Sequence, residues 1–186
     1  MWLPYLAVAD LDGAVRKVTD AGGKVLVAAT PVSTMGSVAA VLDPQGAPLG
    51  LAVPRVDLPA EPSQPVVGQF FWAEYMASDV PRALSFYKDL AGFESSVGDT
   101  QNGLEYHVLR RQRARAGLYQ LPRAASAITP NWLPYVRVAD PAAMAARATA
   151  LGGKVLFTPS PSVRNGTLAI VADPTGGAVA LQKWPL

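Results

Sequence analysis

The feature that most constrains the fold of this 186-residue chain is an internal repeat, because one short unit occurs twice in the same register. Three segments recur 130 residues further along: Trp-Leu-Pro-Tyr at 2–5 and 132–135, Gly-Gly-Lys-Val-Leu at 22–26 and 152–156, and Asp-Pro-x-Gly at 43–46 and 173–176. Chance does not hold one spacing over so long a stretch. The chain therefore contains a duplicated structural unit.

Each copy predicts the same order of elements. Alternating residues at 3–8 predict a strand with two differently buried faces. Asp10 then suits a helix N-cap, because its carboxylate accepts a free backbone N–H, and Gly22 suits the helix end, since glycine accepts a left-handed backbone. Further strands are predicted at 24–29, 37–42 and 49–53, with Asp-Pro-x-Gly as the last turn. The unit is β-α-β-β-β.

A third, more divergent copy lies between these two. Its predicted first strand is 70–76, Asp79 is its N-cap, and its helix runs from Val80 to Leu90. Its other strands are predicted at 94–97, 104–110 and 116–121. We therefore expect a single unit at 1–54, a proline-rich linker at 55–67 and a complete two-unit domain at 68–186, with its units at 68–122 and 130–186.

Composition limits the classes of protein to consider. Half of the residues are apolar and 16% are charged, which is typical of a globular protein. The chain has no cysteine, which excludes disulfides and thiol catalysis. No apolar run is long enough to span a membrane, and the first residues lack signal-peptide features. We expect a cytoplasmic protein with no membrane partner.

A cluster of four arginines is the strongest local charge, at positions 110, 111, 113 and 115. Nucleic-acid binding favours basic residues spread over a face with aromatic residues between them. Four arginines at one predicted hairpin tip are more typical of a solvated turn. We expect no nucleic-acid partner.

The repeated unit resembles the vicinal oxygen chelate superfamily, which includes glyoxalase I, bleomycin-resistance proteins and extradiol dioxygenases. The residues that carry the resemblance are Ser78-Asp79, Ala83, Phe86-Tyr87, Gly92-Phe93 and the two Asp-Pro-x-Gly turns. The resemblance implies an α+β fold in which paired units curl one mixed sheet around a cup-shaped cavity. Units 68–122 and 130–186 would form such a cup. Unit 1–54 would be half of one, and we expect it either to form a homodimer with its counterpart in another chain or to follow a fourth unit in a longer protein.

The resemblance also implies where a divalent metal would be held, on the first and last strands of each unit. These positions are Leu3, Gly50, Trp72, Leu133 and Ala180. Because none of these side chains is a metal ligand, we expect no metal and no cofactor.

Period-two alternation predicts which side chains face the cup instead. Glu74 is expected there with Tyr135, and Arg137 is its expected partner, as a ligand-orienting pair or as an internal salt bridge. His107 is the only histidine, and it is either a structural residue or a general base beside Glu74. The predicted ligand-binding residues are Tyr5, Trp72, Glu74, Met76, His107, Tyr135, Arg137 and Gln182.

Three functions from different classes agree with these observations. The first is a metal-free protein that binds or sequesters an aromatic or cationic small molecule in the cup. The second is a lyase, isomerase or dioxygenase of the same superfamily, with a degenerate metal site or one in a further N-terminal unit. The third is an assembly role for unit 1–54. We expect the binding protein rather than the enzyme.

Overall fold

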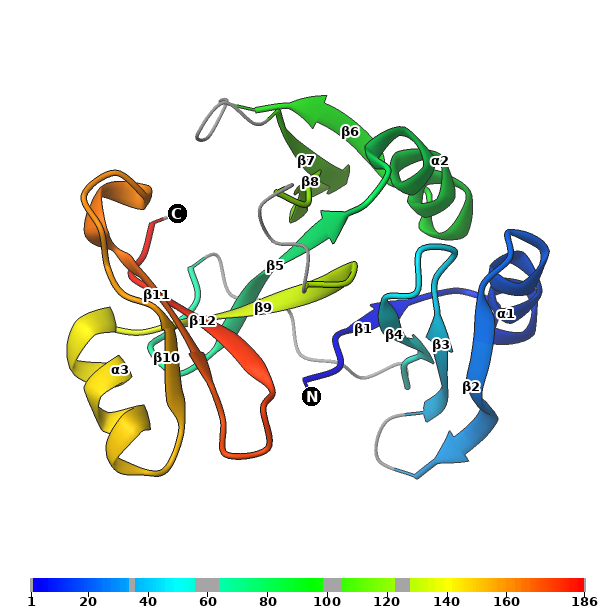
Figure 1. Ribbon diagram of the computed structural model, residues 1–186. Coiled ribbons are helices and arrows are strands. Elements are labelled where there is room, and N and C mark those ends of the chain that lie inside the picture. The colour runs from blue at the N-terminus through cyan, green and yellow to red at the C-terminus, as the bar shows by residue number, and fades with distance from the viewer. Residues whose placement is uncertain (1, 34–35, 56–63, 99–104, 123–127, 186) are drawn as a thin grey trace.

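The computed structural model describes residues 2–33, 36–55, 64–98, 105–122 and 128–185, and it contains two separate sheets (Figure 1). The first unit forms a four-stranded sheet in the order β1-β4-β3-β2. Its elements are β1 (Tyr5–Ala7), α1 (Leu11–Asp20), β2 (Lys24–Val32), β3 (Gly36–Leu42) and β4 (Pro48–Val53). β1 and β4 are parallel, and the other neighbours are antiparallel.

The second and third units share one eight-stranded sheet in the order β10-β11-β12-β9-β5-β8-β7-β6. The second unit consists of β5 (Phe70–Ala77), α2 (Val80–Ala91), β6 (Glu94–Val97), β7 (Tyr106–Arg111) and β8 (Arg113–Gln120). The third consists of β9 (Asn131–Arg137), α3 (Pro141–Ala150), β10 (Lys154–Phe157), a 3-10 turn η1 (Arg164–Gly166), β11 (Leu168–Ala172) and β12 (Ala178–Gln182). The predicted βαβββ order and the α+β class are confirmed.

The two units of the large sheet meet at an antiparallel pair, β5 and β9. Ala73 lies opposite Pro134, and each of them precedes by six residues the aspartate that caps the following helix. Those caps are Asp79 and Asp140, whose carboxylates accept the backbone N–H groups three residues on. The pairing is therefore symmetric from Trp72 to Glu74, where a local two-fold rotation relates the two units, and the register shifts between Phe70 and Trp72.

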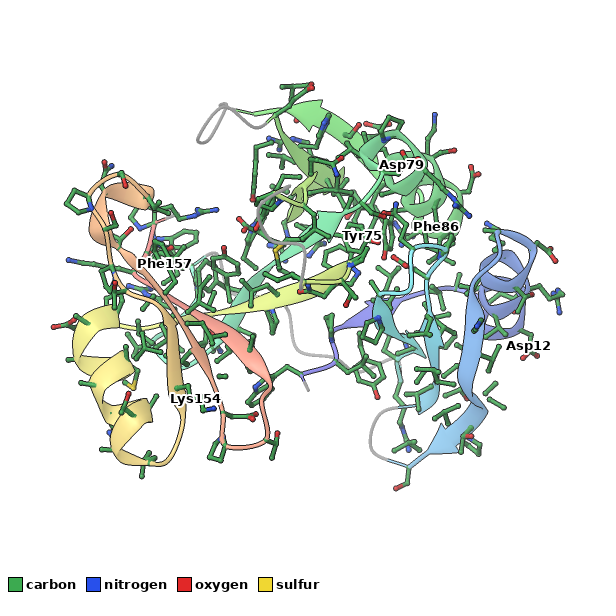
Figure 2. All side chains as sticks on the ribbon, in the orientation of Figure 1. Asp12, Tyr75, Asp79, Phe86, Lys154 and Phe157 are labelled. Carbon is green, nitrogen blue, oxygen red and sulfur yellow. The ribbon has the colours of Figure 1, made fainter. Side chains whose placement is uncertain are left out.

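The first unit is not isolated, because its helical face packs against the second unit. One apolar cluster joins α1 and the inner face of its sheet to α2 and β5. Tyr75 and Phe86 lie in this region, between the two sheets (Figure 2). The half-domain expected from the sequence thus buries one face within the chain itself.

The Asp-Pro-x-Gly turn of the first unit fixes this contact. The Gln45 side chain accepts hydrogen bonds from Ser78 N, Ser78 Oγ and Asp79 N at 2.7–3.0 Å. Asp43 is 3% exposed, and its Oδ2 accepts the Tyr87 hydroxyl at 2.8 Å. The start of α2 is therefore held by the first unit as well as by its own N-cap.

Several local features differ from the expectations. β2 extends to Val32 and β1 is shorter than expected, while the 3-10 turn at Arg164–Gly166 has no counterpart in the predicted elements. Most of the predicted linker and the predicted start of a strand at Leu104 lie outside the described residues. Within the described ranges, no helix has both the length and the apolar character needed to cross a bilayer.

Candidate functional site

The site is built on the concave face of the eight-stranded sheet, called the cup below. Successive side chains of β5 alternate, so that Tyr75 and Ala77 enter the core under α2 while Trp72, Glu74 and Met76 face the cup. Tyr135 of β9 lies beside them. The alternation predicted for the two central strands is therefore what the structure shows.

Glu74 is the centre of the site, because it is a carboxylate that is only 3% exposed. Tyr106 donates its hydroxyl to Oε1 at 2.8 Å, and Tyr135 donates to Oε2 at 2.5 Å. The Arg164 guanidinium also contacts Oε1 and forms a salt bridge with it. A buried carboxylate needs such partners, because an unpaired one is unstable or becomes protonated. Removing one partner of a buried ion pair typically lowers the free energy of unfolding by about 3–5 kcal/mol.

Arg164 reaches Glu74 from an unusual backbone. Arg164 and Asn165 have φ values of 46° and 52°, in the left-handed region that costs roughly 1–2 kcal/mol per non-glycine residue. The guanidinium carbon lies 5.6 Å from the centre of the Tyr135 ring. The ion pair and this ring contact hold the turn in a conformation that it would otherwise leave.

Aromatic residues complete the cluster and stay neutral. Trp72 Nε1 donates to the Tyr106 hydroxyl at 3.1 Å, and the Tyr106 ring stacks on Tyr119 with centroids 6.1 Å apart. Burial, and then the charge of Glu74, raises the pKa of Tyr106, Tyr119 and Tyr135 above the ordinary tyrosine value. Burial is the largest single influence on Arg164 and lowers its pKa, but Glu74, Tyr135 and Tyr106 together outweigh burial, so the pKa of Arg164 is raised.

The predicted partner of Glu74 was wrong. Arg137 does not reach this carboxylate; its Nη1 donates to the backbone oxygen of Pro65 instead. Arg137 lies at the end of β9, opposite Gln182 of β12, whereas Glu74 lies opposite Leu133. Arg137 and Glu74 therefore lie too far apart along the strands to form an ion pair.

Three other predicted residues lie apart from the cluster. His107 follows Tyr106 on β7, so its side chain points to the opposite face, where it lies 3.9 Å from Glu105. Gln182 is fully buried, donates to Thr167 Oγ1 at 2.9 Å, and has no partner for Oε1 among the described residues. Tyr5 belongs to the other sheet and is 47% exposed.

Sequence reasoning missed Tyr106, Tyr119 and Arg164. The alternation on β7 and β8 could have found the two tyrosines, because Tyr106 and Tyr119 lie directly opposite each other. Nothing in the repeat could have found Arg164, since the position 130 residues earlier is Thr34, which is not an arginine.

The positions where the resemblance places metal ligands do not fit a metal ion. Leu133 and Ala180 belong to an apolar cluster, and Gly50 lies under the Tyr5 ring. Trp72 faces the cup with an indole, which is not a ligand. Within the described part of the chain, no three His, Cys, Asp or Glu side chains are grouped closely enough to hold a metal.

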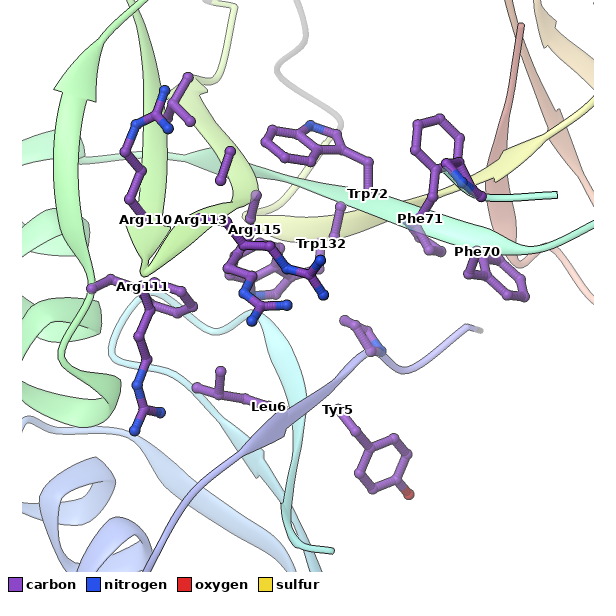
Figure 3. Close-up of a pocket in the computed structure, with 18 of the residues that line it drawn as sticks. Tyr5, Leu6, Phe70, Phe71, Trp72, Arg110, Arg111, Arg113, Arg115 and Trp132 are labelled. Carbon is purple, nitrogen blue, oxygen red and sulfur yellow. The ribbon is translucent and has the colours of Figure 1, made fainter. Parts of the chain in front are cut away.

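A pocket of about 1370 Å³ opens beside the cup and continues to β1 (Figure 3). Trp72, Tyr106 and Arg164 line it from the concave face, and Trp132 lines it from the other face of the large sheet. The arginines of the β7–β8 hairpin lie on one side of it, with Tyr5 and Leu6 on the other (Figure 3). The described lining contains five arginines and neither Asp nor Glu, and one of these arginines, Arg164, is paired with Glu74.

Comparisons with known proteins agree with this geometry. The family model of the Glyoxalase/Bleomycin resistance protein/Dioxygenase superfamily matches residues 69–181. A Mycobacterium bovis protein named "Putative glyoxylase CFP32" is 31% identical over 98% of this chain and 69% of its own length. The anthracycline biosynthesis protein DauV of a Streptomyces species is 28% identical over 97% of this chain and 65% of its own length.

Solved structures show the same fold. The 2,2',3-trihydroxybiphenyl 1,2-dioxygenase of Sphingomonas wittichii superposes with a TM-score of 0.58 at 18% identity, over 97% of this chain and 70% of that one. The Mn(II)-bound glyoxalase of Novosphingobium aromaticivorans gives 0.57 at 16% identity, over 96% and 61%. The chain thus spans about two thirds of the length of these proteins.

Proposed function

The chain belongs to the Glyoxalase/Bleomycin resistance protein/Dioxygenase superfamily, and from this premise we propose that its cup binds a planar aromatic molecule without a metal ion. One observation carries the proposal. Trp72, Tyr106 and Arg164 line one pocket from the concave face, where the family's metal positions hold side chains that cannot coordinate. An indole and a guanidinium together favour a flat ligand with an electron-rich or anionic group.

The charge of the pocket supports an aromatic ligand with an acidic group rather than a cationic one. A cationic ligand would need a free carboxylate, and both oxygens of Glu74 are already hydrogen-bonded to protein groups. The basic lining instead favours an acidic or phenolic oxygen on the ligand. An aromatic ligand also agrees with the names of the anthracycline biosynthesis relatives.

Titration calorimetry with anthraquinone-2-sulfonate, a planar aromatic anion, tests this proposal. We expect saturable binding, which Trp72→Ala and Arg164→Gln each weaken about tenfold, equivalent to roughly 1.4 kcal/mol per substitution. Arg147→Gln, on the exposed side of α3, is the matched charge control and should bind as the unchanged chain does. Thermal unfolding of each variant establishes that it is folded.

A cationic probe separates the alternatives. The planar cation 9-aminoacridine should bind more weakly than the sulfonate, and tighter binding of the cation would contradict the assigned ligand class. If neither probe binds, or if Trp72→Ala leaves the affinity unchanged, the cup is not the binding site.

The second candidate is a lyase, isomerase or dioxygenase activity, favoured by the name of the Mycobacterium bovis relative. Most enzymes of the superfamily need a metal ion, whereas the proposed binding role does not. Elemental analysis of the purified chain discriminates the two, since stoichiometric manganese, iron, nickel or zinc would support the enzyme and overturn the metal-free proposal.

A further inference from the structure

The strands β5 and β8, which meet at Glu74, are paired over only half of their length. Their ladder begins where Glu74 lies opposite Gly117 and continues to the ends of both strands. The preceding residues, 70–73 of β5 and 113–116 of β8, have no ladder pairs with each other. They are held from the far side instead, by β9 and by β7. The space between these two runs is called the slit below.

The large pocket passes through the slit. Every residue from 70 to 73 and from 110 to 116 lines it. Because successive side chains of a strand point to opposite faces, a pocket lined by both complete runs reaches both faces of the sheet. Trp72 lines it from the concave face, and Trp132 lines it from the other face, where Leu6 of the first unit also lines it. The slit therefore connects the cup with the space beside the first unit.

A bulge in β8 places arginines along this passage. Leu109 lies opposite Ala116 and Arg110 opposite Ala114, so Arg115 is one extra residue in β8. Arg110 shares the concave face with Tyr106, four residues before it, by alternation along β7. Arg111 points to the opposite face, and the two side chains leave the hairpin in opposite directions (Figure 3). Basic side chains thus line the slit from one face to the other.

The two walls of the slit differ in chemistry. The β5 wall carries Phe71 and Trp72, whereas the β8 wall carries Arg113 and Arg115. Arg111 lies directly opposite Arg113, and like charges at such a pair destabilise a hairpin. An acidic group bound among these arginines relieves that repulsion, because guanidinium groups form charge-assisted hydrogen bonds with carboxylate, sulfonate or phosphate oxygens. The slit therefore suits a ligand that is both flat and anionic.

The size of the pocket agrees with a ligand that extends beyond the cup. Its volume is about 1370 Å³. Sites for one drug-sized molecule usually have roughly 300–1000 Å³. One flat ring system beside Trp72 and Arg164 leaves the part of the pocket at the slit unfilled.

We propose that the slit is a second anion subsite, in which Arg113 and Arg115 bind an acidic group at the far end of the cup's aromatic ligand. This inference rests on the function proposed above, and it narrows the ligand class from a planar aromatic anion to an elongated aromatic dianion. One acidic group lies near Arg164, the rings lie beside Trp72, and the second acidic group lies in the slit.

The test compares anthraquinone-2,6-disulfonate, which has sulfonates at opposite ends of its rings, with anthraquinone-2-sulfonate. Titration calorimetry at 0.15 M salt, where the Debye length is about 8 Å, limits the effect of distant charges. We expect the disulfonate to bind about tenfold more tightly, equivalent to roughly 1.4 kcal/mol. This ratio of affinities should fall to about one in Arg113→Gln and in Arg115→Gln. Arg147→Gln, on α3, is the matched charge control and should keep the ratio near ten.

A shorter pair of probes controls for charge alone. The sulfonates of benzene-1,3-disulfonate are too close together to reach both subsites, so it should gain nothing from Arg113 or Arg115 relative to benzenesulfonate. An equal gain in this pair would show general attraction to the basic hairpin and overturn the second subsite.

The remaining outcomes separate this inference from the proposed function. If the monosulfonate binds through Trp72 but the disulfonate binds no more tightly, or if the ratio survives in both arginine variants, the second subsite is wrong and the cup remains the binding site. If the monosulfonate does not bind, the proposed function fails and this inference fails with it. Thermal unfolding establishes that each variant is folded.

Discussion

At the scale of single residues, each unit places a small residue beside a large one at the same point of its sheet. Tyr5 lies opposite Gly50, Glu74 opposite Gly117, and Tyr135 opposite Ala180. In the second unit the small residue makes room for a third side chain. A Cβ built on Gly117 would lie 1.9 Å from the Tyr106 hydroxyl oxygen, so the hydrogen bond from Tyr106 to Glu74 depends on this glycine.

The first prediction follows from this close approach. Gly117→Ala should force Tyr106 away from Glu74 and lower the free energy of unfolding by about 1–3 kcal/mol, the usual range for overpacking. Urea unfolding measures it. Gly50→Ala is the matched control in the first unit, where the added Cβ meets the half-exposed Tyr5 ring, which can turn into solvent. An equal loss in both variants would show that the Tyr106 contact is not the cause.

The residues of the cup differ in how far they could be predicted from sequence. Trp72, Glu74 and Tyr135 followed from alternation, because a strand repeats every two residues whatever surrounds it. Arg164 could not be predicted in this way. It contacts a carboxylate 90 residues earlier in the chain, from a turn with left-handed backbone that follows no periodic pattern. Arg137 was the wrong choice because alternation predicts which face of the sheet a side chain occupies, but not how far along the strands it lies from Glu74.

At the scale of elements, the two repeated Asp-Pro-x-Gly turns have the same local structure and different surroundings. In each turn the aspartate accepts the backbone N–H groups two and four residues on. Asp43 additionally accepts Tyr87 from α2 and is buried, whereas the turn at Asp173 lies at the surface. The repeat predicted both turns, but not that one of them joins the first unit to the second.

The second prediction compares these two turns. Asp43→Ala leaves a buried tyrosine hydroxyl and two backbone N–H groups without their acceptor, and it should lower the free energy of unfolding by about 3 kcal/mol. Asp173→Ala removes the same local bonds at the surface, where water replaces them, and the loss should be smaller. Thermal and urea unfolding check both. The idea fails if Asp173→Ala is as destabilising as Asp43→Ala.

At the scale of the whole molecule, two groups of buried or half-buried tyrosines connect the units. Tyr106, Tyr119 and Tyr135 surround Glu74 in the cup, and Tyr75 and Tyr87 lie near Asp43 where the first unit meets the second. Burial, followed by the charge of Asp43, raises the pKa of Tyr75 and Tyr87. Both places where units join therefore depend on neutral hydroxyl groups.

The sign of the pH effect follows from these raised pKa values. The folded chain holds tyrosine protons that the unfolded chain releases near pH 10, the ordinary tyrosine pKa (about 10). Below that pH both states are protonated and the tyrosines contribute no pH dependence. Above it the unfolded state binds fewer protons, so stability falls as pH rises, by about 1.4 kcal/mol per pH unit for each such tyrosine.

The third prediction is therefore a steep alkaline unfolding transition. For these five tyrosines, tyrosinate absorbance should appear together with the loss of the circular dichroism signal, because their raised pKa values keep them protonated until the chain unfolds. Tyr119→Phe keeps the ring that stacks on Tyr106 and removes one hydroxyl, so the slope of stability against pH above 10 should decrease by one tyrosine's share, about 1.4 kcal/mol per pH unit. If these tyrosines ionise while the chain keeps its native circular dichroism spectrum, their hydroxyl groups are accessible to solvent in the folded state. Neutral, buried hydroxyl groups would then not be what joins the units.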